Sequence, residues 1–422
     1  MINQRIFSAN VGDSSVGIAG PDAIEQDIDN LLANDQELLG TLNDHETQIN
    51  DLDADVLDIN VNIKNFGAIG NGAIDDTQAI QDAIDYTYTN GGGVVLIPQG
   101  SYKITAPLIM QNGVSIIGVG SMRDDNAIVS EILNASNGTA IQFPNTKSYT
   151  SVRLQNFSIK GDTISGYTPT YAIEGENFKT HCIIENIRIW KHQYGIKLTH
   201  CYYSKIQNNY INTAKTAIDL TTANGVKVSN NIVHGIDDVD SYGIYVAGSP
   251  IEIEHNFIEN CTLKRAIYTS YSNGVLIKSN YLENVNGTGI YIGYSNTVNI
   301  MSNYMRSGSS GNIARGILLY NGDNFVIYGN YIEKTTVHTI RADGATNVIA
   351  FENYLDESAG ATYSVGLAVG TFKARIRTLA TSTANRPSDA ARGEMFFDTS
   401  LGKPIFYDGT NWVDATGTIV WL

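Results

Sequence analysis

The sequence predicts an all-β protein whose main domain is a right-handed parallel β-helix with about 23 residues per coil. Two repeated signatures between residues 140 and 356 indicate this fold. One is a small residue followed by isoleucine, and the other is asparagine followed by an apolar or aromatic residue. Short alternating strands and no helical stretch lie between them, which excludes leucine-rich and helical repeats.

In the first signature we expect each isoleucine to point inward and the residue after it to point outward. Its members are Ala140-Ile141, Ala172-Ile173, Gly195-Ile196, Ala217-Ile218, Gly243-Ile244, Ala266-Ile267, Gly289-Ile290, Gly316-Ile317 and Thr339-Ile340. In the second signature, stacked coils place the asparagines about 4.8 Å apart as an amide ladder, at a turn where Asn tolerates left-handed geometry. Its members are Asn156, Asn186, Asn209, Asn231, Asn256, Asn280, Asn303, Asn330 and Asn353.

The composition excludes several classes of partner. A net charge of −16 argues against nucleic acid and against an acidic membrane surface. No run approaches 18 apolar residues, and residues 1–10 lack the basic and apolar segments of a signal peptide. Cys182, Cys201 and Cys261 are odd in number and scattered, so we interpret them as small buried hydrophobic residues.

The N-terminal segment contains a heptad repeat. Residues 1–27 show no strong period and are interpreted as a short adaptor. Residues 28–60 place Ile28, Asp35, Leu42, Ile49 and Val56 at a, and Leu31, Leu38, His45, Leu52 and Ile59 at d. This apolar stripe needs partner helices, and its mixture of Ile and Leu permits three strands. We therefore predict a trimeric coiled coil and a homotrimer, with Asp35 and His45 as polar layers that fix the register.

The predicted β-helix, residues 61–372, opens with a series of short motifs. They are Asn65-Phe66-Gly67-Ala68, Gly70-Asn71-Gly72, the run from Asp75 to Ile84, the run from Gly91 to Pro98, Gly100, Tyr102 and Gly118-Val119-Gly120. This segment closely resembles the opening of the pectate-lyase-like superfamily, as found in bacteriophage tailspikes and exopolysaccharide depolymerases. The resemblance implies the fold and a polysaccharide substrate. It transfers no catalytic residue, because the calcium-site, Asn-Thr-Asp and Gly-His-Gly motifs of the related enzymes are absent.

A capping helix is predicted over residues 77–89. Asp76 or Thr77 can act as the N-cap, and Gly91 to Gly93 end the helix. The apolar face consists of Ala79, Ile80, Ala83, Ile84 and Tyr88. Such a helix is expected to cover the open end of the β-helix.

Residues 373–422 differ in composition from the repeats and predict a small β module. Asp408-Gly409 is a turn signal within it. The sequence leaves open whether the module is a trimer clasp, a receptor-binding tip or a cap for the β-helix.

Three longer coils suggest where a ligand binds. Their insertions, Gly161–Thr170, Gly235–Ser241 and Ser307–Ala314, fall at one corner of the solenoid, which commonly marks the binding face. The outward column after the repeat isoleucines includes three successive tyrosines, on which sugar rings can pack. The predicted substrate-binding residues are Tyr245, Tyr268, Tyr291, Arg265, Lys197 and Asp219.

Glycoside hydrolysis needs two carboxyl groups at a set separation. Glu259 and Glu283 occupy the same place in adjacent coils, where mutual repulsion would help one hold a proton. Asp237, Asp238 and Asp240 lie on the second insertion. These five are the predicted catalytic residues, with the Glu174–Lys197–Asp219 column as the next choice. For each set the alternative is solvated surface charge.

A lyase is the second chemistry considered. It would need a base and a cation or Ca²⁺ to hold a uronate carboxylate, with Arg265, Lys197 and His255 as candidates. No metal site and no other cofactor are predicted.

The predicted function is a phage tailspike-like depolymerase of capsule or exopolysaccharide, attached to the tail or baseplate through the N-terminus. The predicted location is the virion tail, which leaves the host by lysis. Two alternatives remain: a non-catalytic fibre that binds a glycan receptor, and a depolymerase of wall teichoic acid.

Overall fold

The computed structural model describes a large central domain and a smaller C-terminal segment of the chain. The described residues are 61–121, 129–163, 165–307, 313–333, 335–356 and 395–420, with Gln36, Gly40, Thr41, Thr383 and Arg386. The chain divides into two units, Met1–Asp58 and Ile59–Leu422. The predicted adaptor, the rest of the predicted coiled coil and most of residues 357–394 lie outside the described residues.

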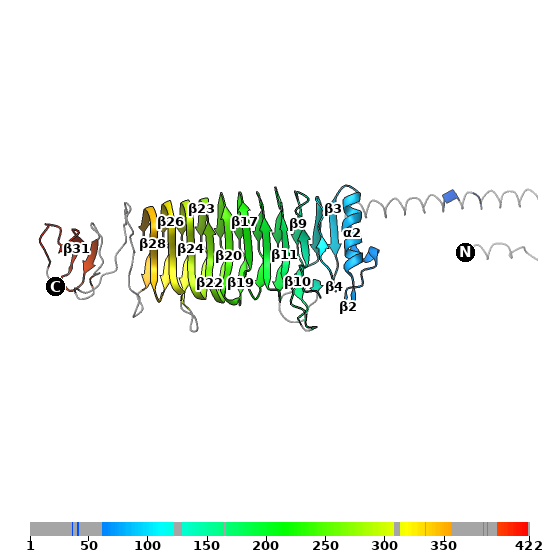
Figure 1. Ribbon diagram of the computed structural model, residues 1–422, viewed down its shortest axis with the longest axis horizontal. Coiled ribbons are helices and arrows are strands. Elements are labelled where there is room, and N and C mark those ends of the chain that lie inside the picture. Colours follow the sequence, from blue (N-terminus) through cyan, green and yellow to red (C-terminus); the bar gives the residue numbers. More distant parts are fainter. Residues whose placement is uncertain are drawn as a thin grey trace, which may run out of the picture. The chain divides into compact units, whose positions relative to one another are not determined.

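Between Val61 and Asp356 the chain winds into a right-handed parallel β-helix, which confirms the predicted fold class (Figure 1). The solenoid has about 11 turns with about 24 residues in each. Each complete coil contributes strands to three parallel sheets, which we number 1 to 3 in the order in which a coil passes through them after the turn that carries its repeat asparagine.

Sheet 1 follows the turn that carries the repeat asparagines. Its strands are β2 (Asn71–Asp75), β4 (Gly100–Ile104), β7 (Ser130–Asn134), β10 (Ser158–Gly161), β13 (Arg188–Trp190), β16 (Tyr210–Asn212), β19 (Ile232–His234), β22 (Phe257–Ser270), β24 (Tyr281–Met301), β25 (Tyr304–Arg306), β27 (Tyr331–Glu333) and β29 (Tyr354–Asp356). The long strands β22 and β24 bend at corners and continue into other sheets.

Sheet 2 carries the repeat isoleucines. It consists of β5 (Leu108–Ile109), β8 (Ile141–Phe143), β11 (Tyr171–Glu176), β14 (Tyr194–Thr199), β17 (Ile218–Ala223), β20 (Asp237–Gly248), parts of β22 and β24, β26 (Ile313–Tyr328) and β28 (His338–Phe351). Sheet 3 consists of β1 (Val61–Asn62), β3 (Gly93–Ile97), β6 (Val114–Gly118), β9 (Arg153–Gln155), β12 (Ile183–Glu185), β15 (Lys205–Gln207), β18 (Val226–Ser229), β21 (Ile251–Glu254), β23 (Asn273–Lys278) and parts of β24, β26 and β28.

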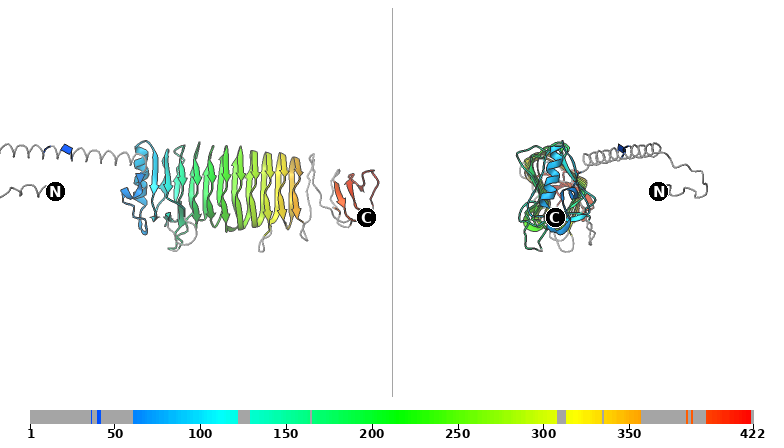
Figure 2. Two further views of the ribbon diagram at one scale, coloured as in Figure 1. Left: turned by 180° about the vertical axis from the view of Figure 1, so that it is seen from behind. Right: turned by 90° about the vertical axis from the view of Figure 1, so that its right-hand side faces the viewer.

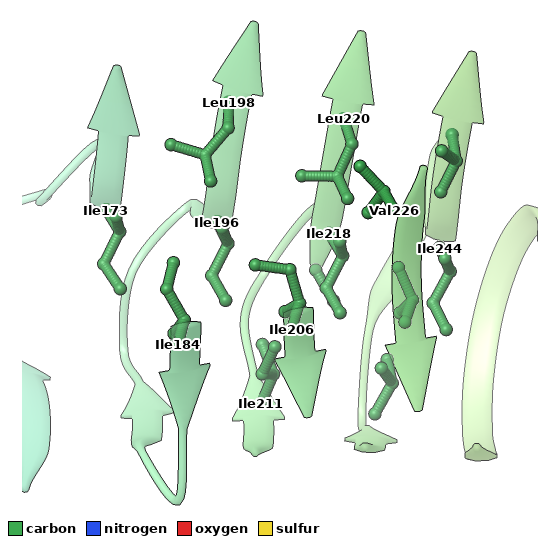
Figure 3. Packing of buried hydrophobic residues seen from close by; sticks show 14 of the residues in the cluster. Ile173, Ile184, Ile196, Leu198, Ile206, Ile211, Ile218, Leu220, Val226 and Ile244 are labelled. Carbon is green, nitrogen blue, oxygen red and sulfur yellow. The ribbon is translucent and has the colours of Figure 1, made fainter. Parts of the chain in front are cut away.

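The repeat isoleucines form the core, as predicted. Ile173, Ile196, Ile218 and Ile244 pair in register from coil to coil, and each is at most 1% exposed. Figure 3 shows this row of side chains inside the solenoid. Burying one such side chain contributes roughly 1.5–3 kcal/mol. Since these residues point inward, the residues that follow them in sheet 2 point outward.

The predicted amide ladder is confirmed from Asn209 to Asn353. Within it, Asn256 Nδ2 donates to Asn280 Oδ1 at 3.0 Å, and Asn280 Nδ2 donates to Asn303 Oδ1 at 2.9 Å. The left-handed geometry belongs to the preceding residue instead, such as His255 with φ 55° and Ser279 with φ 54°. The ladder therefore requires Asn because its side-chain amide bonds to the next coil, and not because Asn tolerates a left-handed backbone. Only the first two members of the signature, Asn156 and Asn186, are themselves left-handed.

A short 3₁₀ helix, η1 (Ile63–Phe66), and the helix α2 (Thr77–Thr89) precede the regular coils. Helix α2 lies over the end of the solenoid, as Figure 2 shows in its right-hand view. Ile80, Ala83 and Ile84 are fully buried, whereas Tyr88 is 47% exposed and so does not join the buried face as predicted.

The N-terminus of α2 is capped differently from the prediction. Asp76 occupies the N-cap position, but its carboxylate accepts hydrogen bonds from the amides of Ile69 and Gly70, at 2.6 and 3.1 Å, instead of from the helix. The neighbouring Asp75 accepts from the Thr77 amide at 3.0 Å. Asp76 thus holds the loop that contains Ile69 and Gly70 against the start of helix α2.

The C-terminal described residues form an antiparallel sheet of β30 (Met395–Asp398), β31 (Lys403–Tyr407) and β32 (Trp412–Val413). The predicted turn at Asp408-Gly409 joins β31 to β32. No helix in the described ranges is long and apolar enough to cross a membrane. All three cysteines are buried and unpaired, and burial raises the pKa of Cys201 to about 12 and of Cys182 and Cys261 to about 11.

Candidate functional site

The outward column predicted after the repeat isoleucines lies on sheet 2 in unbroken register. It reads Glu174, Lys197, Asp219, Tyr245, Tyr268, Tyr291, Leu318 and Arg341. All eight side chains are half-buried. The column brings together all the predicted substrate-binding residues except Arg265, which lies three residues before Tyr268 on the same strand.

The tyrosines form a compact cluster with Arg265. Tyr245 stacks on Tyr268 with ring centroids 4.5 Å apart, and Tyr268 meets Tyr291 edge to face at 5.2 Å. Tyr242, which the sequence reasoning did not select, contacts Tyr268 at 5.1 Å. The Arg265 guanidinium lies 4.3 Å from the Tyr268 ring centroid and 3.7 Å from that of Tyr291. Tyr245 and Arg265 cover the faces of the Tyr268 ring. A ligand would therefore meet mainly hydroxyl groups, ring edges and the Arg265 guanidinium, and few open ring faces.

Asp219 is the carboxyl group that adjoins this cluster. Burial raises its pKa, and the charge of Lys197 only partly offsets that effect. One carboxylate oxygen, Oδ1, is buried with no hydrogen-bond partner among the described residues. A carboxyl group in this environment holds a proton at a higher pH than an ordinary aspartate, which suits proton transfer.

Lys197 lies between two carboxylates of the column. Its ammonium group is 3.9 Å from Glu174 Oε1 and donates to the Tyr171 hydroxyl at 3.4 Å. Burial alone would lower its pKa, but Tyr171, Glu174 and Asp219 together raise it. Lys197 therefore supplies a permanent positive charge next to Asp219.

Two hydroxyls of the cluster, those of Tyr245 and Tyr291, have a pKa above the ordinary value. Tyr245 Oη and Ser270 Oγ share a hydrogen bond of 3.0 Å. Burial raises the pKa of Tyr245 and of Tyr291, although Arg265 works against that rise at Tyr291. Neutral hydroxyls can both donate to and accept from a sugar.

Glu259 and Glu283 pair in register, as the sequence predicted, but they belong to sheet 1. The aromatic cluster lies on sheet 2, so the structure does not bring these two acids to it. Glu283 accepts from the Tyr281 hydroxyl at 3.0 Å and lies 3.6 Å from Arg306. It therefore has a cationic partner in addition to the like charge of Glu259.

The acids of the second insertion lie at the start of β20. Asp237 and Asp238 pair with Thr262 and Leu263 of β22. Asp240 is 84% exposed and forms an ion pair with Lys264 at 3.7 Å, while its amide donates to Asp238 Oδ1. Among the described residues, none of the hydrogen bonds or ion pairs of these three acids reaches the aromatic cluster. Residue 164 of the first insertion and residues 308–312 of the third lie outside the described residues.

Sequence reasoning missed a second row of aromatic residues, on sheet 1. Tyr281, Tyr304, Tyr331 and Tyr354 stack in order at 5.2, 4.6 and 4.6 Å, with rings within 8° of parallel. The signal was present, because each follows a ladder asparagine. Since neighbouring rings cover each other's faces, this row stabilises the solenoid and leaves mainly ring edges for a ligand.

Comparison with known proteins fits this architecture. Residues 60–127 match the family model described as "Rhamnogalacturonase A/epimerase, pectate lyase-like". The opening of the β-helix therefore contains a pectate-lyase-like family-model domain. Residues 193–367 match a second family model, "Periplasmic copper-binding protein (NosD)". In the described ranges no three His, Cys, Asp or Glu side chains gather to hold a metal ion.

The curated relatives match only a short segment. The chain is 44% identical over 66 residues to mannuronan C5-epimerase AlgE2 of Azotobacter vinelandii, which is 14% of this chain and 7% of that enzyme. It is equally similar over 66 residues to alginate lyase 7 of the same organism, covering 8% of that protein. The chain thus spans less than a tenth of the length of these polysaccharide-acting relatives.

A solved structure extends the likeness beyond this short segment. DFA-IIIase from Arthrobacter chlorophenolicus A6 superposes with a TM-score of 0.62, covering 74% of this chain and 94% of that one, at 13% sequence identity. At this identity the likeness shows the fold alone.

Proposed function

We propose that this protein binds a polysaccharide across sheet 2 and cleaves it with Asp219 as the proton-transferring group. The observation that supports this most strongly is the environment of Asp219. It is a half-buried carboxyl with a raised pKa and an unpartnered oxygen, placed between Lys197 and the tyrosine cluster. The enzymes named for mannuronan and alginate among the relatives support the class of substrate.

The favoured reaction is glycoside hydrolysis. Protonated Asp219 would donate to the leaving-group oxygen, and Glu174 would activate water as the second carboxylate. These residues lie two coils apart with Lys197 between them. Two strand spacings, roughly 9.6 Å, fall near the separation of inverting glycosidases. Arg265 and the tyrosine hydroxyls would hold the sugar.

β-Elimination is the second candidate chemistry. Lys197 and Arg265 lie on either side of Asp219 along sheet 2 and could neutralise a uronate carboxylate, which lowers the cost of removing the adjacent proton. Asp219 would then act as the base. The similarity of a 66-residue segment to an alginate lyase supports elimination as an alternative to hydrolysis.

We further propose that the protein is the tailspike of a bacteriophage and acts on a bacterial surface polysaccharide. The heptad at 28–60, the resemblance of the opening motifs and the β-helix support this proposal. A homotrimer attached to the tail or baseplate through its N-terminus would present three such sheets. A fibre that only binds its glycan would share the cluster but would not depend on the proton of Asp219.

The deciding experiment compares Asp219→Asn with wild type on lawns of candidate host strains and on their extracted surface polysaccharides. We expect wild type to clear a lawn and Asp219→Asn to cleave about 10²–10⁴-fold more slowly while still binding, because the amide keeps the shape but cannot transfer a proton. Released reducing ends indicate hydrolysis, and ultraviolet absorbance of an unsaturated uronate indicates elimination.

Three matched variants complete this design. Glu252→Gln, an exposed carboxylate on sheet 3, should remain fully active. Glu259→Gln and Glu283→Gln test the acids of sheet 1. Full activity of Asp219→Asn together with an inactive sheet 1 variant would move the site to sheet 1.

A further inference from the structure

The corner between sheets 2 and 3 adopts a left-handed backbone in successive coils. The residues with positive φ there are Asn177, His200, Thr222, Gly248, Tyr271, Tyr294, Asn321 and Gly344, with φ of 58°, 55°, 52°, 148°, 50°, 49°, 54° and 68°. Glycine and asparagine adopt this conformation readily, but for a bulky side chain it is an outlier that carries strain. Among the described coils, tyrosine occupies this position only in the two whose sheet 2 strands carry Tyr268 and Tyr291.

Both corner tyrosines are exposed to solvent. Tyr271 is 74% exposed and Tyr294 is 46% exposed. Their rings are parallel within 3° at 5.1 Å, so Tyr294 covers one face of Tyr271. The coil before Tyr271 places Gly248 at this corner, counting on from the pairing of Val246 with Thr269. The other face of Tyr271 therefore remains open.

Buried serines hold this corner in place. Ser272 Oγ donates to the Ser270 carbonyl at 2.9 Å, and Ser295 Oγ donates to that of Gly293 at 2.8 Å. The Ser272 amide donates to Ser295 Oγ at 3.2 Å, which joins the two coils. These hydrogen bonds fix the strained backbone. The tyrosine rings are not part of the core, so their burial does not offset the free-energy cost of that strain.

Polar groups flank the two rings. Asn273 and Asn296 pair in register two residues beyond Tyr271 and Tyr294, and both are exposed. Tyr320 meets Tyr294 edge to face at 5.4 Å. Tyr294 and Tyr320 are also near enough to Tyr291 to affect its pKa, so the corner is continuous with the cluster on sheet 2.

We propose that Tyr271, Tyr294 and Tyr320, with Asn273 and Asn296, form a second sugar-binding surface for the same polysaccharide chain. The open face of Tyr271 packs against the C–H face of a pyranose ring, and the amides bond its hydroxyls. The two rings are exposed and their backbone is strained, so they do not stabilise the fold. Their position beside the proposed site on sheet 2 favours a role in binding the ligand. This inference rests on the proposed function and extends it to sugar units beyond the one that meets Asp219.

The test is affinity electrophoresis of the double variant Tyr271→Asn/Tyr294→Asn. The gel contains surface polysaccharide extracted from a strain whose lawn the wild-type protein clears. We expect binding to weaken roughly tenfold, the scale of a lost aromatic stacking contact. Because Asn tolerates the left-handed backbone, the unfolding temperature should stay the same or rise.

Tyr203→Asn is the matched control. Tyr203 is also left-handed, with φ 47°, and is 61% exposed, but it stacks on no other ring in the described part of the chain. This variant should bind as wild type does. Unchanged binding of the double variant, with wild type retarded, overturns this inference and leaves the proposed function standing. If wild type clears no lawn of any bacterial strain and no extracted polysaccharide retards it in the gel, both the proposed function and this inference are contradicted.

Discussion

At the scale of single residues, the source of an elevated carboxyl pKa differs from the one expected. The sequence suggested repulsion between Glu259 and Glu283, because like residues in adjacent coils are close. In the structure Arg306 lies beside Glu283, whereas Asp219 is affected chiefly by burial. Burial depends on how neighbouring tyrosines pack over a side chain, which a repeat pattern does not reveal.

Asp219 should also make stability depend on pH. Its pKa is raised on folding from the ordinary 3.8, so the folded protein holds this proton more tightly than the unfolded chain does. Ionised Asp219 therefore lowers the free energy of unfolding at pH values above the ordinary pKa of 3.8, and it has no such effect at lower pH, where the group is protonated in both states. We expect Asp219→Asn to unfold at higher urea concentration than wild type at about pH 7, with the gain vanishing near about pH 3.

Asp237→Asn, an exposed carboxylate of β20, is the control for general effects of removing one negative charge. An equal gain in stability for both variants would contradict the assignment of the effect to burial of Asp219.

At the scale of elements, the repeat predicted much of the structure. The isoleucine and asparagine signatures gave the inward face, the coil length, the coil-to-coil register and the outward column of sheet 2. They did not give the turns, because a turn conformation depends on hydrogen bonds to the next coil. The ladder was expected to be left-handed at Asn itself, yet the residue before it takes that geometry. The repeated Tyr-Ser-Asn at 271–273 and 294–296 was a visible but unused signal for the corner.

The ladder predicts a large cost for losing one rung. Asn280 accepts from Asn256 and donates to Asn303 and to the Ile253 carbonyl, all within the core. Asn280→Ala leaves buried polar partners unsatisfied, and we expect it to lower the free energy of unfolding by roughly 2–4 kcal/mol in urea titration. Asn299→Ala, on the outer face of sheet 3, should cost no more than about 0.5 kcal/mol. Similar losses for the two variants would show that the ladder is not a major source of stability.

At the scale of the whole molecule, the sequence predicted a solenoid with a capping helix and a small terminal β module. The structure contains the β-helix, helix α2 and the three-stranded sheet β30–β32. The candidate site was predicted in part. The column Lys197, Asp219, Tyr245, Tyr268 and Tyr291 was predicted from periodicity alone, whereas Tyr242 was recognised only in the structure. Assembly remains a prediction, because the heptad lies outside the described residues.

We predict that the full chain sediments as a trimer, with three times the 45.9 kDa of one subunit. The apolar stripe at 28–59 needs partner helices, which a single chain does not supply. Removing residues 1–60 should weaken assembly and leave the β-helix folded by circular dichroism, since each coil is stabilised by its neighbours. Sedimentation of the intact chain as a folded monomer would contradict this prediction.

The register of the coils has a consequence for how such a chain can evolve. Ile196 meets Ile218 as Ile267 meets Ile290, and Asn209 meets Asn231 as Asn280 meets Asn303. A coil that was duplicated or lost between two others would find matching neighbours above and below it. Gene duplication within the repeat could thus lengthen or shorten the solenoid one coil at a time, while the coils that bear Asp219 and the tyrosines descend unchanged.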